Sequence, residues 1–197
     1  MQNKAFYIIA MFVSVSLFCV FAEDAINLLS NGNFEVQETG APTAWKGYSA
    51  DNPAVVDSLE HPESAAKSLK IVLKKAGGEG YGSIGQDIPI SKENSKLVLR
   101  GEIKSTKKGM AFLQIKLKKG KEEIKRISTD PCDVQWGAAK LEFSTETADK
   151  VSVLCRFKQT EEFLNETAWF ANLKLVEQKP GQPAEAKPEA KTEPKTE

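Results

Sequence analysis

The stretch Leu113-Gln-Ile-Lys-Leu-Lys118 places an apolar side chain at every second position, with a glutamine or a lysine between. This two-residue period is that of a β-strand with one buried face and one solvent-facing face. The same period recurs between residues 68 and 176 in five more segments, at 68–74, 97–104, 140–144, 151–157 and 172–175. The centre of the chain is therefore predicted to be a set of short strands.

Turn-forming residues separate these segments, as at 76–80, 105–109 and 130–131. Glycine, asparagine, aspartate, serine and proline favour such turns because each fits a backbone conformation or local hydrogen bond that strands lack. No amphipathic helix of useful length lies between the strands. We therefore predict an all-β fold, an antiparallel β-sandwich of the jelly-roll form.

Both ends of the chain differ from this central region. Residues 1–22 combine Lys4, an apolar run and Val-Phe-Ala at 20–22, which predicts a cleaved signal peptide and a secreted or periplasmic protein. Residues 178–197 are rich in Lys, Glu, Pro and Ala and predict a disordered tail, because such a segment cannot form a core. We expect one folded domain over residues 23–177.

Charge and hydropathy limit the partners of the mature chain. The sequence holds 27 basic and 27 acidic residues, and loss of Lys4 with the signal leaves a net charge of −1. This balance predicts no nucleic-acid partner, and no segment after residue 23 is apolar enough for a membrane span. The sequence does not indicate an oligomeric state.

Two cysteines, Cys132 and Cys155, remain after signal cleavage. Disulfides persist outside the cytoplasm, so we expect a bridge between them that adds roughly 3 kcal/mol of stability. The alternative is two separate buried thiols.

Four motifs in order resemble one family of domains. The opening stretch Asn27-Leu-Leu-Ser-Asn-Gly-Asn-Phe-Glu35, with Pro42–Trp45 after it, is similar to the start of carbohydrate-binding modules of families four, nine and twenty-two. The segments Ser68–Ile71, Tyr81–Ile88 and Trp169–Leu175 resemble later strands of those modules. The resemblance implies a galactose-binding-like jelly roll that binds a poly- or oligosaccharide.

The resemblance also implies a structural calcium ion, held in part by an acid on the closing strand. Here that position is Ala171, which leaves Glu35 and Asn172 as the candidate metal ligands. Calcium prefers several hard oxygen ligands, so the loss of a carboxylate weakens this site. A hydrogen-bonded Glu35 without calcium is the alternative, and we expect no other cofactor.

Candidate sugar-binding residues combine rings for stacking with planar polar groups for hydrogen bonds. The resemblance places Tyr81 where these modules carry a ligand-stacking ring; its alternative is a tyrosine that seals the sandwich edge. Phe112 is out of phase with Leu113 and predicts an outward ring, either a sugar platform or a ring under a crossing loop. Gln114 and Arg100 also point away from the core in this pattern, although for Arg100 an ordinary cross-strand pair with Glu102 or a neighbour is favoured.

The remaining aromatic residues divide between core and groove. Trp45 and Tyr48 follow the opening motif and are candidates for a groove wall, with a core position favoured for Trp45. Trp136 and Trp169 are expected in the core, Trp169 because it is in phase with Leu173 and Leu175.

No catalytic motif accompanies these residues. His61 is the only histidine in the sequence, which excludes most mechanisms in which a histidine activates a nucleophile. The sequence also has no zinc-ligand spacing, nucleophile elbow or phosphate-binding loop. We therefore predict a non-catalytic glycan-binding protein. A structural or adhesion scaffold of the cell envelope is the alternative, and an accessory part of a glycoside hydrolase is a further one.

Overall fold

The computed structural model of the chain describes residues 26–38, 41–47, 51–77 and 80–178. The expected signal peptide, nearly all of the expected tail and Tyr48 lie outside these ranges. Among the described residues, no helix has the length and apolarity needed to cross a membrane.

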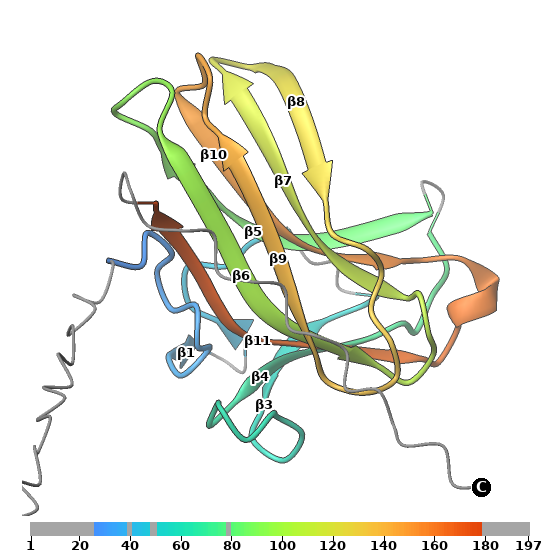
Figure 1. The fold of residues 1–197 in the computed structure, drawn as a ribbon. Helices are drawn as coiled ribbons and strands as arrows, with labels where there is room; N and C mark the ends of the chain where they lie inside the picture. Colours follow the sequence, from blue (N-terminus) through green and yellow to red (C-terminus); the bar gives the residue numbers. More distant parts are fainter. Residues whose placement is uncertain (1–25, 39–40, 48–50, 78–79, 179–197) are drawn as a thin grey trace, which may run out of the picture.

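Two antiparallel sheets form the domain (Figure 1). The four-stranded sheet has the order β5 (Tyr81–Pro89), β10 (Lys150–Lys158), β7 (Ala111–Lys119) and β8 (Glu122–Ser128). The five-stranded sheet has the order β3 (Ala54–Asp57), β4 (Ser68–Val72), β11 (Thr167–Glu177), β6 (Lys96–Ser105) and β9 (Gly137–Ser144). A hairpin of β1 (Gln37–Glu38) and β2 (Ala41–Pro42) and a 3₁₀ turn, η1 (Glu161–Phe163), lie outside the two sheets.

The core lies between the sheets and consists of the alternating apolar residues. In the four-stranded sheet Leu113 lies opposite Cys155, which lies opposite Ile84, and all three are fully buried. In the other sheet Phe170 lies opposite Leu69 and Ile103 in the same way. Directly opposed residues of an antiparallel pair share a face, so the alternation builds one continuous core. The predicted all-β sandwich is confirmed.

The opening motif ties the start of the domain to its last strand. The side chain of Asn27 donates to the carbonyl of Leu173 at 3.1 Å and accepts from the amide of Leu175 at 2.9 Å. Gly32 packs against the same strand so closely that a Cβ there would lie 2.1 Å from the Leu173 oxygen. Gln86 of β5 completes the clamp through both Ser30 main-chain groups. The motif that resembles carbohydrate-binding modules therefore has a structural role.

A β-bulge interrupts β11 and reverses its side-chain pattern. The register shifts between Ala171 and Lys174, where Asn172 has φ of 51°. Phe170 faces the core before the bulge and Leu173 after it, so Trp169 faces outward. The expected core position of Trp169 is wrong, because the bulge adds one residue and breaks the phase with Leu173.

The expected disulfide is also wrong, since Cys132 and Cys155 are both free thiols. The amide of Cys132 bonds to Ala111 on one side of β7, whereas Cys155 of β10 lies opposite Leu113 on the other side. Two strand spacings amount to roughly 9 to 10 Å. A disulfide spans Cα atoms no more than about 7 Å apart.

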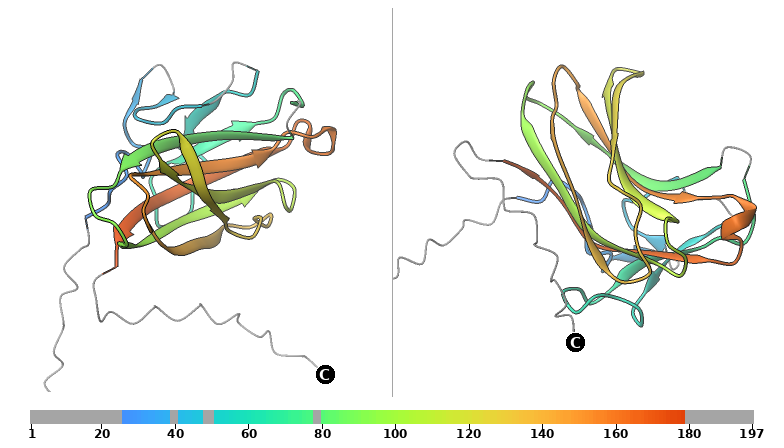
Figure 2. Two further views of the ribbon diagram at one scale, coloured as in Figure 1. Left: turned by 90° about the horizontal axis from the view of Figure 1, so that it is seen from above. Right: turned by 45° about the vertical axis from the view of Figure 1, so that its right-hand side comes forward.

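The two sheets are curved as well as twisted. The right-hand view of Figure 2 shows the four-stranded sheet bending around the face that points away from the five-stranded sheet. We call this outward side of β5, β10, β7 and β8 the concave face.

Candidate functional site

The concave face brings together residues from strands far apart in sequence. Its successive rows follow from the strand register: Phe112 lies opposite Arg156, Gln114 opposite Leu154, Lys116 opposite Ser152, and Lys118 opposite Lys150. Tyr81 begins β5 opposite Lys158, at the same end as Phe112 and Arg156. Three of the sequence-predicted residues, Tyr81, Phe112 and Gln114, therefore share this face.

Tyr81 and Phe112 form an aromatic pair at one end of the face. Their ring centroids are 5.8 Å apart in an edge-to-face arrangement. The side chain of Tyr81 is 43% exposed and that of Phe112 only 9% exposed. Phe112 thus supports the Tyr81 ring from below, and Tyr81 offers the ring surface to solvent.

Arg156 completes this aromatic end, although it is not among the residues predicted from the sequence. Its guanidinium carbon lies 5.2 Å from the centre of the Tyr81 ring. A stacked guanidinium fixes the ring and carries directed N–H donors. The signal was present in the sequence, because Arg156 alternates with the buried Cys155 and Phe157.

Gln114 lies at the middle of the face and is only 5% exposed. Its Nε2 donates to the hydroxyl of Ser128 on β8 at 2.8 Å. Its buried Oε1 accepts no hydrogen bond from the residues that the structure describes. If the amide nitrogen and oxygen were exchanged, one of them would still lack a partner, because the single Ser128 hydroxyl can hydrogen-bond to only one of the two atoms.

The two acidic side chains on the concave face are ionised and take part in hydrogen bonds and ion pairs. A hydrogen bond from the Ser152 hydroxyl, together with Lys118 and Lys150, holds the pKa of Asp87 below its usual value. Hydrogen bonds from Arg126 and Lys116 lower the pKa of Glu123 to about 2. Neither carboxyl group carries a proton near neutral pH.

The other predicted ligand residues do not join this face. Arg100 points away from the core as expected, but it lies on β6 of the five-stranded sheet and shares no surface with Gln114. Trp45 is buried in the core, 5.2 Å from Phe34 between ring centroids, and its indole N–H donates to the Asn31 carbonyl. The favoured core position of Trp45 is therefore confirmed.

The predicted calcium ligands, Glu35 and Asn172, take part in hydrogen bonds with neighbouring residues. The Asn172 amide nitrogen donates to Ser64 and Glu102 at 2.8 Å each, and the Lys67 ammonium contacts the Glu35 carbonyl oxygen at 3.2 Å. An ammonium group beside this carbonyl oxygen disfavours a divalent cation there. The described part of the chain holds no group of three or more His, Cys, Asp or Glu side chains suited to a metal. Calcium binding stays a prediction without support from these contacts.

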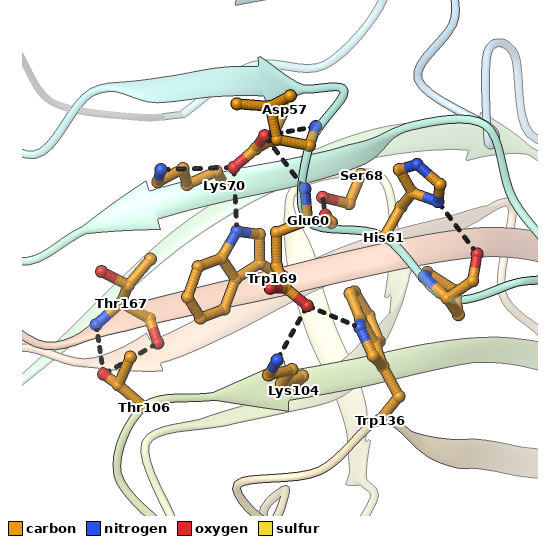
Figure 3. Close-up of polar contacts among 12 residues, drawn as sticks. Asp57, Glu60, His61, Ser68, Lys70, Lys104, Thr106, Trp136, Thr167 and Trp169 are labelled. Carbon is orange, nitrogen blue, oxygen red and sulfur yellow. Dashed lines mark hydrogen bonds and ion pairs between the residues drawn. The ribbon is translucent and has the colours of Figure 1, made fainter.

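A second aromatic cluster lies on the outward face of the five-stranded sheet (Figure 3). Trp169 lies between two ion pairs, Asp57–Lys70 at 3.2 Å and Lys104–Glu60 at 2.7 Å, and its indole N–H donates to Asp57. Trp136 donates to Glu60 in the same manner, so its expected core position is wrong.

The two acids in this cluster, Asp57 and Glu60, both have lowered pKa values. Burial raises the pKa of Asp57, but hydrogen bonds from Leu59, Trp169 and Lys70 outweigh it and leave the pKa lowered. The hydrogen bond from Lys104 lowers the pKa of Glu60. Trp169 is only 8% exposed beneath its charged neighbours, so its ring is not available for stacking.

An open cavity of about 970 Å³ lies at the edge between β9 and the chain after β8. Arg100, Asp130 and Lys140 are among its lining residues, and none of the fifteen is aromatic. Sugar recognition depends on stacking against rings, so the concave face is the better candidate.

No family model matches the chain, and no curated protein does. Solved structures do match. The carbohydrate-binding module TmCBM61, solved with β-1,4-galactotriose, has a TM-score of 0.56 and 11% identity over 78% of this chain and 100% of the module. A family 16 carbohydrate-binding module-2 has a TM-score of 0.55 and 20% identity over 76% of this chain and 99% of the module.

One similar structure belongs to a much longer chain. The enzymatically active domain of tailspike protein 4 from bacteriophage CBA120 has a TM-score of 0.59 and 13% identity over 77% of this chain. This chain spans only 21% of that protein's length. At these identities the likeness establishes the fold, which is the jelly roll of carbohydrate-binding modules.

Proposed function

We propose that this chain is a secreted, non-catalytic glycan-binding protein that holds an oligo- or polysaccharide on its concave face. The observation that carries the proposal is the grouping of Tyr81, Phe112, Arg156 and Gln114 on one curved sheet surface. The exposed ring of Tyr81 matches the apolar C–H face of a sugar, and Arg156 and Gln114 match its hydroxyl groups.

Similarity of fold does not identify the ligand of this chain. One module with the same fold was solved with a bound galactotriose, and that ligand belongs to that module. For this chain the argument depends on its own side chains. A single exposed ring and few polar contacts favour weak, reversible binding in the micromolar to millimolar range.

Five acids of the folded domain have pKa values that do not suit a proton donor in catalysis. Glycoside hydrolysis needs a carboxylic acid whose pKa is raised so that it donates a proton. The pKa values of Asp57, Glu60, Asp87, Glu123 and Asp133 all lie below their ordinary values. A hydrolytic role would therefore need an acid outside this set.

Affinity electrophoresis against a panel of soluble polysaccharides, with a glycan array, tests the proposal. Tyr81→Ala should weaken binding about tenfold, or roughly 1.4 kcal/mol, because the stacking surface is lost. The free energy of unfolding should fall by less than about 1 kcal/mol, since Tyr81 is 43% exposed. Leu59→Ala is the matched control, because Leu59 is 93% exposed and lies outside the concave face.

Undiminished retention by Tyr81→Ala would remove this face as the binding site. Failure of the unaltered protein to bind any glycan would instead favour the structural or adhesion scaffold.

A further inference from the structure

The concave face has an excess of positive charge. Its outward positions carry six basic side chains, Lys116, Lys118, Arg126, Lys150, Arg156 and Lys158. They carry two acidic side chains, Asp87 and Glu123. Four positive charges are left over on a single sheet face of a chain whose 27 basic and 27 acidic residues balance.

Four of these cations form two like-charge pairs across adjacent strands. Lys118 of β7 faces Lys150 of β10, and Lys116 of β7 faces Arg126 of β8. Like charges in directly opposed positions destabilise a sheet. A negatively charged ligand between the cations would relieve this repulsion.

The acids on the face compensate for only part of this repulsion. Glu123 contacts Lys116 at 2.9 Å and Arg126 at 2.7 Å. Asp87 contacts Lys150 more loosely, at 3.6 Å. Two carboxylates shared among six cations leave the face positive at neutral pH.

Four of the cations, Lys116, Lys118, Arg126 and Lys150, lie farther along the strands than the aromatic pair, whereas Arg156 and Lys158 lie beside it. Tyr81, Phe112 and Arg156 lie at one end, Gln114 lies at the middle, and Lys118 and Lys150 lie at the other end. Eight residue steps separate Lys158 from Lys150 along β10, which is at most roughly 26 Å for an extended strand. The face is therefore long enough for an oligosaccharide whose one part stacks and whose other part carries charge.

We infer that the ligand is an anionic polysaccharide, one with carboxylate or sulfate groups on its sugars. The inference rests on the proposed function and specifies its ligand class. A single-stranded nucleic acid fits less well, because such ligands stack successive bases on several exposed rings. Here Tyr81 is exposed and Phe112 is buried beneath it.

Binding to polygalacturonate and to its fully methyl-esterified form tests the inference, because the two polymers share a backbone and differ in charge. Isothermal titration with the full chain should give at least tenfold tighter binding to the acid form. The difference should shrink at high salt, since the screening length falls from about 10 Å at 0.1 M to about 3 Å at 1 M. Dextran sulfate, with dextran as its neutral control, separates sulfate from carboxylate as the source of the charge.

Charge-removing variants locate the binding to this face. Lys118→Gln combined with Lys158→Gln should weaken binding to polygalacturonate roughly three- to tenfold and reduce its salt dependence. Lys96→Gln combined with Lys174→Gln is the matched control. It removes the same charge from two exposed positions on the five-stranded sheet and should leave the affinity unchanged.

The outcomes separate the two proposals. Equal binding to the acid and the ester, or binding to neutral polymers alone, overturns the charge inference and leaves glycan binding in place. An oligothymidylate that binds as tightly as polygalacturonate also overturns it, because the face would then recognise any polyanion. Failure of every polysaccharide to bind removes the proposed function and the inference together.

Discussion

Gln114 combines near-complete burial with an amide oxygen that accepts no hydrogen bond from the described residues. A buried polar atom left in this state costs about 1 to 3 kcal/mol. An apolar residue would avoid this cost, so the glutamine at this position is consistent with the proposed ligand-binding role.

Gln114→Met separates this explanation from a structural one. Methionine has a similar length and no polar atom, so the free energy of unfolding should stay the same or rise by up to about 1 kcal/mol. Glycan affinity should fall about tenfold, because the ligand loses a buried hydrogen-bond partner. Urea unfolding and affinity electrophoresis measure the two quantities. A large loss of stability would assign Gln114 to the fold instead.

Gln114 could be predicted from the sequence because alternation along one strand shows which of its side chains lie on the same face. The two-residue period of β7 places Phe112 and Gln114 opposite the core, and the structure agrees. The same reasoning paired Gln114 with Arg100, which lies on the other sheet. Alternation assigns a residue to one side of its own strand and contains no information on which strands become neighbours.

At the scale of elements, the clamp between the opening motif and β11 decides how the domain closes. Gly32 lies so close to β11 that a Cβ would come within 2.1 Å of the Leu173 oxygen. The main chain of Leu173 is held there, because its amide donates to the Gly32 carbonyl at 2.9 Å. A side chain at residue 32 must therefore displace a strand.

Gly32→Ala should lower the free energy of unfolding by about 2 to 4 kcal/mol, because the clashing atom belongs to the main chain and has little room to move. Gly137→Ala is the control, since a Cβ at this first residue of β9 meets nothing within 4 Å. It should change stability by less than about 0.5 kcal/mol. Thermal and urea unfolding compare the two variants, and equal stabilities would show that the contact is not rigid.

The bulge in β11 explains why the aromatic residues were harder to place than the strands. Trp169 and Leu173 are in phase by counting, yet the extra residue at the bulge puts them on opposite sides of the sheet. Asn172 with φ of 51° allows this turn of the chain. Asparagine tolerates positive φ, but the residue also occurs in ordinary strands, so the sequence alone did not predict a bulge there.

At the scale of the whole molecule, strand order determines whether the two thiols can form a disulfide. The spacing of Cys132 and Cys155 in the sequence suits a disulfide loop, and the expected export favours one. The structure places β7 between them. Burial also raises the pKa of the Cys155 thiol, which makes it inert. A disulfide between these two residues therefore does not contribute to the stability of the domain.

The acidic groups also determine how the stability of the whole domain depends on pH. The pKa of Glu123 is about 2 in the folded protein, against an ordinary value of 4.5. A carboxyl group with a lowered folded pKa stabilises the protein above its unfolded pKa, and this contribution disappears as the pH falls from about 4.5 towards 2. The lowered pKa values of Asp57, Glu60 and Asp87 act in the same direction. Thermal stability should therefore be flat from pH 7 to 5 and fall steadily below pH 4.5.

Glu123→Gln should change stability and binding in opposite directions. At pH 7 the variant should lose roughly 0.5 to 1 kcal/mol of stability, a surface-pair value, because Lys116 and Arg126 lose their shared partner. Its stability should also fall less steeply between pH 4.5 and 2. Affinity for polygalacturonate should rise severalfold, because the face then carries six basic groups and one acid. Glu142→Gln makes the same charge change on the five-stranded sheet and should leave this affinity unaltered. If Glu123→Gln binds no more tightly than Glu142→Gln, the positive charge of the concave face does not attract the ligand.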